Sequence, residues 1–153
     1  MIEIRPVTPG EFPLFEPLFV LYQEFYEVKD IDRGRNREFF SRFLVGEDGV
    51  GSADGWLLGA FDGEEAVGFG CFYRHKSSLS ATDVVLMNDL FVTEAARGGG
   101  TGRALIEAAV ELARESGASH LTWATAPDNH TAQRLYDSTG AHKSTWLEYE
   151  IEA

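Results

Sequence analysis

Three consecutive glycines stand between two arginines in the segment Arg97-Gly98-Gly99-Gly100-Thr101-Gly102-Arg103. A backbone without Cβ atoms can curl tightly and turn successive N–H groups toward one point. Apolar spacing predicts a helix over 101–115, and the first N–H groups of a helix have no partner inside it. Together with the positive end of the helix dipole, these groups favour an anion. The segment therefore predicts a site for a phosphate or a pyrophosphate.

Two common glycine-rich phosphate motifs do not fit this segment. A Walker loop ends in Lys followed by Ser or Thr, whereas Gly102 is followed by Arg103 and Ala104. The dinucleotide fingerprint requires a third glycine where this chain has Arg103. Arg97 and Arg103 flank the glycines of an acidic chain, so we expect them to contact the phosphate rather than to serve only as surface charges.

Two motifs in a fixed order carry a family resemblance. The first is Arg97 to Gly102, which satisfies the pattern Gln/Arg-x-x-Gly-x-Gly/Ala directly after the strand-like residues 89–92. The second is Asn129-His130-Thr131-Ala132-Gln133-Arg134-Leu135-Tyr136, followed by Gly140-Ala141. In both motifs the chain resembles the GNAT superfamily of N-acetyltransferases. The likeness extends over the whole chain in element order, and 123–136 looks closest to the polyamine, D-amino-acid and histone-tail branches.

The resemblance implies acetyl-CoA as the donor and an amine as the acceptor. It implies that the backbone of Leu90, Phe91 and Val92 holds the pantetheine arm as an added strand would. A backbone N–H near Phe91 would then support the developing oxyanion. Asn129 would reach the pantetheine. The pyrophosphate would lie on Arg97, Gly98, Gly99, Gly100, Thr101, Gly102 and Arg103.

The resemblance also implies that Tyr136 is the general acid facing the leaving sulfur. Tyr136 shares an apolar helix face with Ala132 and Leu135, so an ordinary core tyrosine is the alternative. Asn129 has a second role open to it, as the N-cap of the same helix. The general base is open between Asp89 and Glu24, either of which could act through water.

Aromatic and acidic side chains are predicted to select the acceptor. Tyr22, Tyr26 and Glu27 lie on the first predicted helix, and Trp146 lies on the last predicted strand. Aromatic rings and carboxylates suit an alkylammonium group through cation–π and ion-pair contacts. The same tyrosines match the apolar stripe of the helix, and Trp146 matches strand alternation, so a packing role is the alternative.

The remaining pattern predicts an α/β (α+β) fold in the order β-α-α-β-β-β-α-β-α-β, with a mixed, mostly antiparallel sheet and helices on both faces. Thr8-Pro9-Gly10-Glu11 is typical of a capping box, and Pro13 and Pro17 predict a kink in the helix that follows. A loop is expected over 46–55. Strands are predicted over 2–7, 56–61, 66–73, 84–92, 120–125 and 143–151. Helices are predicted over 9–27, 33–45 and 101–115 and between Asn129 and Gly140.

Length, net charge and cysteine content bear on the number of domains, the compartment and the class of partner. The chain has 153 residues, a net charge of −12 and one cysteine, Cys71. We expect one N-acetyltransferase domain over 1–153, without a metal site, in the cytoplasm. The acidic field disfavours nucleic acid and attracts cations. No apolar run is long enough to cross a membrane.

The sequence thus predicts an enzyme that moves acetyl from acetyl-CoA directly to a primary amine, on a small cationic molecule or on a lysine-containing peptide. The resemblance implies a homodimer. Two alternatives remain open: an enzyme acting on the N-terminal α-amine of a protein, and a CoA-binding sensor domain without turnover.

Overall fold

Five strands form one sheet in the computed structural model, which describes residues 1–46 and 51–153. Their order is β1-β2-β3-β4-β5, and neighbours run antiparallel except for the parallel pair β4–β5. The mixed, mostly antiparallel sheet is as predicted. The strands are β1 (Ile2–Pro6), β2 (Gly55–Asp62), β3 (Glu65–Ser77), β4 (Thr82–Val92) and β5 (Leu121–Thr122).

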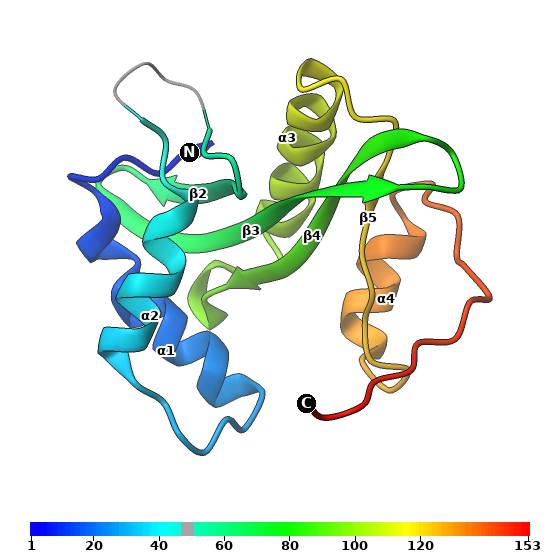
Figure 1. Ribbon diagram of the computed structural model, residues 1–153. Coiled ribbons are helices and arrows are strands. Elements are labelled where there is room, and N and C mark those ends of the chain that lie inside the picture. Colours follow the sequence, from blue (N-terminus) through cyan, green and yellow to red (C-terminus); the bar gives the residue numbers. More distant parts are fainter. Residues whose placement is uncertain (47–50) are drawn as a thin grey trace.

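Helices cover both faces of this sheet (Figure 1). The first two lie on one face, the third on the other, and the fourth beside β5. Within residues 1–46 and 51–153, no helix combines the length and apolar character needed to cross a bilayer. The helices are α1 (Glu16–Phe25), α2 (Arg33–Phe40), α3 (Thr101–Glu115) and α4 (His130–Asp137), with 3₁₀ turns η1 (Phe12–Leu14), η2 (Ser41–Phe43) and η3 (Glu94–Ala96).

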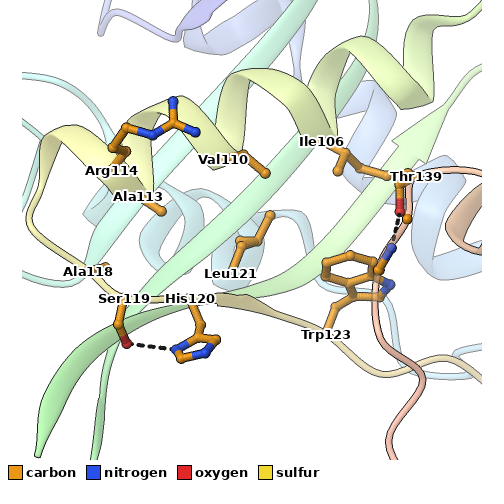
Figure 2. Close-up of a pocket in the computed structure, with 12 residues that line it drawn as sticks. Ile106, Val110, Ala113, Arg114, Ala118, Ser119, His120, Leu121, Trp123 and Thr139 are labelled. Carbon is orange, nitrogen blue, oxygen red and sulfur yellow. Dashed lines mark hydrogen bonds between the residues drawn. The ribbon is translucent and has the colours of Figure 1, made fainter. Parts of the chain in front are cut away.

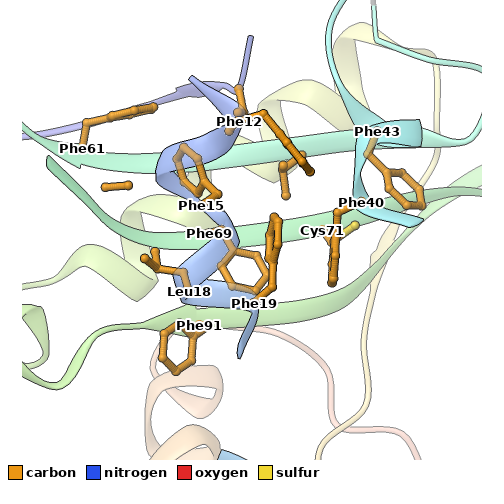
Figure 3. Close-up of a cluster of buried hydrophobic side chains, with 13 residues drawn as sticks. Phe12, Phe15, Leu18, Phe19, Phe40, Phe43, Phe61, Phe69, Cys71 and Phe91 are labelled. Carbon is orange, nitrogen blue, oxygen red and sulfur yellow. The ribbon is translucent and has the colours of Figure 1, made fainter. Parts of the chain in front are cut away.

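Phenylalanine dominates the core between the sheet and α1 and α2 (Figure 3). Phe15, Phe19 and Phe69 are fully buried, and Phe19 stacks on Phe40 with ring centroids 3.9 Å apart. Fully burying one such side chain contributes about 1.5–3 kcal/mol. This core therefore fixes α1 firmly against β3 and β4. A second core, between the sheet and α3, includes Leu105 and is free of such ring stacking.

A β-bulge in β4 changes which face its side chains occupy. Phe72 pairs with Met87 and Cys71 pairs with Asp89, so Asn88 is an extra residue in the ladder. Side chains of a regular strand alternate, and Met87 and Asp89 would then share a face. Instead Met87 packs in the α3 core while Asp89, opposite Cys71, faces α1. The bulge therefore delivers Asp89 to the α1 side of the sheet.

The pairing between β4 and β5 is short. Only Val85↔Leu121 and Leu86↔Thr122 are paired in the described residues. Beyond Leu86 the two strands are no longer hydrogen-bonded, and the edge of β4 from Asn88 to Val92 has no strand beside it on that side. A free strand edge presents N–H and C=O groups to whatever lies against it.

The first predicted helix is interrupted, as its prolines indicated. Glu11 accepts hydrogen bonds from the Thr8 N–H (3.1 Å) and hydroxyl (2.8 Å), so the carboxylate half of the capping box is present. The chain then forms η1 and restarts as α1 at Glu16. The helix predicted over 33–45 ends sooner, at Phe40, and tightens into η2. Of the loop predicted over 46–55, residues 47–50 lie outside the described residues.

The predicted strand over 143–151 is wrong. This segment has no regular structure, and Leu147, Tyr149 and Ile151 are 78%, 91% and 95% exposed. A strand requires a neighbour for its backbone groups, and β5, predicted over 120–125, has only two paired residues. The loop predicted between β3 and β4 is shorter than expected, because His75 to Ser77 extend β3 and Thr82 begins β4.

Candidate active site

Asp89 is a buried carboxylate at the centre of a tyrosine cluster. Its side chain is only 5% exposed, and Oδ1 accepts hydrogen bonds from the Tyr22 hydroxyl and from the Asn88 amide at 3.1 Å. Tyr22 reaches it from α1, where its ring packs edge-on against Phe69 and Phe91. The core thus places a phenol from α1 onto a carboxylate of β4.

Burial sets the ionisation of this cluster. Desolvation raises the pKa of Asp89, and the hydrogen bonds from Tyr22 and Asn88 partly oppose that rise. Burial and the Asp89 charge raise the pKa of Tyr22, of Tyr26 and of Tyr73. A carboxylate with a raised pKa is a better proton acceptor near neutral pH than an exposed one. The cluster therefore has the electrostatic character of a general-base site.

Tyr136 approaches the same region from α4. Its ring packs edge-on against Trp123, 5.4 Å between centroids, and it is half-buried. Burial first, and then the neighbouring Tyr26 phenol, raise the pKa of Tyr136. The Tyr136 hydroxyl has no hydrogen-bond partner among the described residues. Every fully buried side-chain oxygen in those residues does have a partner, so the Tyr136 hydroxyl is not fully buried. It remains a protonated donor that is free to act.

The glycine turn forms an open group of N–H donors. Gly98 and Gly100 have φ of +79° and +88°, the left-handed conformation that glycine adopts without strain. The α3 N-cap Gly100 offers no side-chain cap, and across the described residues the N–H groups from Gly98 to Arg103 donate to no protein acceptor. No atom lies within 4 Å of where a Cβ would stand on Gly98 or Gly100. The turn has the form expected of an anion site.

Both flanking arginines are engaged with protein atoms. Arg97 donates from Nε to the Val92 carbonyl at 2.9 Å, and its guanidinium lies 5.9 Å from the Phe91 ring centroid. Arg103 donates to the Ser138 carbonyl at 3.2 Å and to its hydroxyl at 2.5 Å. Arg97 therefore lies on the C-terminal end of β4, and Arg103 ties α3 to the end of α4. Phosphate contact by either side chain stays a prediction.

The predicted pantetheine contacts of Leu90, Phe91, Val92 and Asn129 stay predictions, and the structure places these residues as follows. The first three form the part of β4 that has no β5 partner. Asn129 is the N-cap of α4, and its Oδ1 accepts from the Ala132 N–H at 3.2 Å. The predicted capping role of Asn129 is confirmed, and its amide nitrogen is left for another contact.

Three predicted residues lie apart from Asp89. Glu24 and Glu27 are exposed, and Glu24 is two residues, about 200° of helix, from Tyr22. Glu27 follows the end of α1 with φ of +58°. Trp146 is 86% exposed on the irregular C-terminal segment, so its predicted place on a strand is wrong.

A hollow of about 360 Å³ lies elsewhere, between α3 and the chain around β5 (Figure 2). It is lined by apolar residues of α3 and by Leu121 and Trp123, and none of the predicted site residues lines it. The candidate site is therefore argued from the buried carboxylate and the open N–H groups, and this hollow is not part of it.

Two features of the site were not predicted from the sequence. Asn88 is the bulge residue and donates to Asp89, and Tyr73 lies near Asp89 from β3, stacked on Phe43. A bulge has no clear pattern in one sequence, although the polar pair Asn88-Asp89 within an apolar strand was a signal that something other than packing occurs there.

Comparison with known proteins assigns the family. The profile described as the Acetyltransferase (GNAT) family matches residues 15–141. Over 97 residues the chain is 42% identical to the D-amino-acid N-acetyltransferase HPA3 of Saccharomyces cerevisiae, covering 62% of this chain and 60% of the yeast protein. Over 144 residues it is 32% identical to the uncharacterized N-acetyltransferase YhfO of Bacillus subtilis, covering 94% and 92% of the two chains.

Solved structures agree in fold. The crystal structure of a probable acetyltransferase superposes with a TM-score of 0.84 at 28% identity, covering 99% of this chain and 97% of that one. AAC(6')-Iy, in complex with a CoA-containing bisubstrate analogue, superposes with a TM-score of 0.79 at 16% identity, covering 100% and 99%. From the match over residues 15–141 and from these relatives, the chain belongs to the GNAT superfamily of N-acetyltransferases.

Proposed function

We propose that this protein transfers acetyl from acetyl-CoA directly to a primary amine, on a small cationic molecule or a lysine side chain. One observation carries the proposal: β4 holds the buried carboxylate Asp89 and then an edge without a strand partner, and η3 connects the end of this strand to the open N–H groups of the glycine turn. A proton acceptor and an anion site thus lie on one continuous stretch of chain, from Asp89 to Arg103.

The residues fit a CoA-type donor. The N–H groups from Gly98 to Arg103 would hold the diphosphate, and the edge at Leu90 to Val92 would hold the pantetheine amides. Bound acetyl-CoA supplies an acetyl thioester, whose thiol leaves readily because its pKa is about 8.5. Arg97 lies at the junction of these two parts, with Val92 as its partner.

The side chains divide the proton transfers between them. An alkylamine has a pKa of about 10 and must lose a proton before it can attack. Asp89 is proposed to take that proton, since burial raises its pKa toward the working range. Tyr136 is proposed to donate to the departing sulfur, and its raised pKa keeps it protonated. Glu24 is exposed, and the scheme assigns it no role.

A cationic acceptor is supported by three observations. The chain carries a net charge of −12, Asp89 has no cation hydrogen-bonded to it among the described residues, and Tyr22 and Tyr26 stand beside it. Aromatic faces and a carboxylate attract an ammonium group. The relative HPA3, named for D-amino acids, is consistent with a small amine substrate.

The test is thiol release from acetyl-CoA across four acceptors: a D-amino acid, a polyamine, a lysine peptide with a blocked N-terminus, and a peptide with only a free α-amine. We expect release with one of the first three. Release with the α-amine peptide alone would favour the N-terminal acetyltransferase, and tight acetyl-CoA binding without any release would favour the sensor domain.

The variant Asp89→Asn tests whether Asp89 is the general base. We expect kcat/KM to fall by about 100- to 10,000-fold, the usual contribution of a positioned acid–base group. Asp83→Asn is the matched control, because Asp83 lies on the same strand but is exposed and paired with Lys76 at 2.6 Å. If Asp89→Asn retained full activity, the proposed base would be wrong.

The homodimer also stays a prediction. Light scattering coupled to size-exclusion chromatography would test it, and a single species of 16.9 kDa would contradict it.

A further inference from the structure

The two oxygens of the Asp89 carboxylate differ in their surroundings. Oδ1 receives both the Tyr22 hydroxyl and the Asn88 amide. Oδ2 receives no hydrogen bond from the described part of the chain. Every fully buried side-chain oxygen in the described residues has a hydrogen-bond partner, so Oδ2, which has none, is not fully buried. Asp89 as a whole is 5% exposed. Oδ1 is therefore held by two donors, and Oδ2 has no donor among the described residues.

We propose that Tyr22 is a positioning residue: with Asn88 it holds Oδ1 of Asp89, so that Oδ2 is the oxygen that takes the proton from the acceptor amine. This inference rests on the proposed function. It assigns Tyr22 a role through Asp89, whereas the sequence had suggested substrate contact or packing for it.

Tyr22 is itself rigidly placed. Its ring packs edge-on against Phe69, Phe91 and Tyr26, at centroid distances of 5.7, 6.2 and 5.1 Å. Sixty-seven residues separate it from Asp89 along the chain. A hydroxyl fixed by its ring loses little entropy when it binds, so it can hold a carboxylate in one rotamer. Asn88 is placed by the bulge, next to the group it binds.

No described positive charge replaces these hydrogen bonds. The titratable groups that face Asp89 are the phenols of Tyr22 in α1 and of Tyr26 at the C-cap of α1, and Cys71 and Tyr73 from β3. Burial raises the pKa of Cys71 and of all three phenols, so each stays neutral through the working range. The anionic carboxylate is therefore stabilised by hydrogen bonding, and Tyr22 is a principal donor.

The protons balance in this scheme. The ammonium gives one proton to Oδ2, which later returns it to solvent. The amine nitrogen then forms the N–C bond as the C–S bond breaks. The nitrogen loses its second proton through water, while the sulfur gains one from Tyr136, which water reprotonates. The net result is an amide, a thiol and one proton released.

The test is the pH dependence of kcat/KM in Tyr22→Phe, which keeps the ring and removes the hydroxyl. A hydrogen bond to a charged group favours the charged form, so its loss raises the pKa of Asp89. We expect the acidic limb of the kcat/KM profile to move up by about one pH unit. At pH values below the limb kcat/KM should then be about tenfold lower than in the unmodified enzyme, and above the limb it should be the same. Tyr73→Phe is the control, since Tyr73 lies near Asp89 but is not hydrogen-bonded to it.

An unmoved limb in Tyr22→Phe, or a loss of equal size at every pH, would overturn the inference. If Tyr22→Phe fails to fold by circular dichroism, Asn88→Ala tests the same oxygen from an exposed position. The limb should again move up, and no movement would overturn the inference. Full activity of Asp89→Asn would contradict the proposed base itself. Loss of activity in Asp89→Asn, together with an unmoved acidic limb of kcat/KM in Tyr22→Phe, would contradict this inference alone.

Discussion

At the scale of single residues, burial acts in the same direction on Asp89 and Tyr136, the side chains proposed as base and acid. Burial disfavours the charged form of each and raises the pKa of both. A raised pKa makes a carboxylate a stronger proton acceptor, and it keeps a phenol protonated as a donor. In the proposed scheme, these side chains on β4 and α4 are the base and the acid, and the described hydrogen bonds to Asp89 come from neutral groups.

Tyr136→Phe should lower kcat by about 10- to 100-fold, because a thiolate leaves without help more easily than an alkoxide does. The loss should be largest at low pH. Acetyl-CoA affinity, measured by calorimetry, should change little, because the ring and its packing on Trp123 remain. Tyr149→Phe is the matched control, since Tyr149 is 91% exposed. A Tyr136→Phe enzyme with unchanged turnover at low pH would remove the acid role.

Residue positions were predictable where a motif names them and not where the fold brings them together. Tyr136 and the glycines stand in contiguous motifs. The contact between Tyr22 and Asp89 depends on α1 packing over β4 and on an unpredicted bulge at Asn88. Both candidate bases were visible in the sequence, but the contact of Tyr22 with Asp89 and the exposure of Glu24, on which the proposal of Asp89 depends, were not.

At the scale of elements, α3 and the glycine turn work as one unit. Gly100 starts the helix from a left-handed conformation, and its carbonyl accepts the Ala104 N–H at 3.0 Å. Gly102 has another reason to lack a side chain, because a Cβ there would lie 3.1 Å from Leu135 of α4. The glycines therefore serve both the N–H group array and the close packing of α3 on α4.

Gly100→Asp should abolish acetyl-CoA binding, because it adds a negative charge to the array and strains a φ of +88°. Gly63→Asp is the matched control. Gly63 also has positive φ, +63°, and open space around it, but it lies in the β2–β3 turn. Both variants should lose about 1 kcal/mol of stability. Calorimetric titration should separate them, and wild-type affinity in Gly100→Asp would contradict the phosphate assignment.

Elements with strong periodicity were predicted well. Helix α3 has its predicted bounds, and Gly117 ends it with φ of +83°. The edges of the sheet were predicted poorly. The alternating residues Leu147, Tyr149 and Ile151 carry a strand pattern, but pattern alone does not supply a partner for the backbone. The extent of β5 likewise depends on pairing rather than on its own residues.

At the scale of the whole molecule, the net charge of −12 acts oppositely on the two substrates. It attracts a cationic acceptor and repels an anionic coenzyme. If the glycine turn binds the coenzyme as proposed, its local N–H groups have to outweigh this long-range repulsion of the diphosphate.

Added salt should consequently move the two KM values in opposite directions. Raising ionic strength from about 0.01 M to about 1 M shortens the Debye length from about 30 Å to about 3 Å. We expect the KM for a polyamine to rise and the KM for acetyl-CoA to fall, each measured by steady-state kinetics with the other substrate saturating. An uncharged competitor amine is the control. Parallel changes in both values would contradict electrostatic selection.

Because of its position, the reactivity of the Cys71 thiol can report unfolding of the protein. Cys71 is the single cysteine, it is fully buried, and burial raises its pKa well above the ordinary value for a thiol. Thiolate is the reactive form, so a colorimetric thiol reagent should leave the folded enzyme unlabelled and read only released coenzyme. A stoichiometric slow phase of colour in enzyme alone would then count molecules that have opened, and its rate would time that opening without any added label.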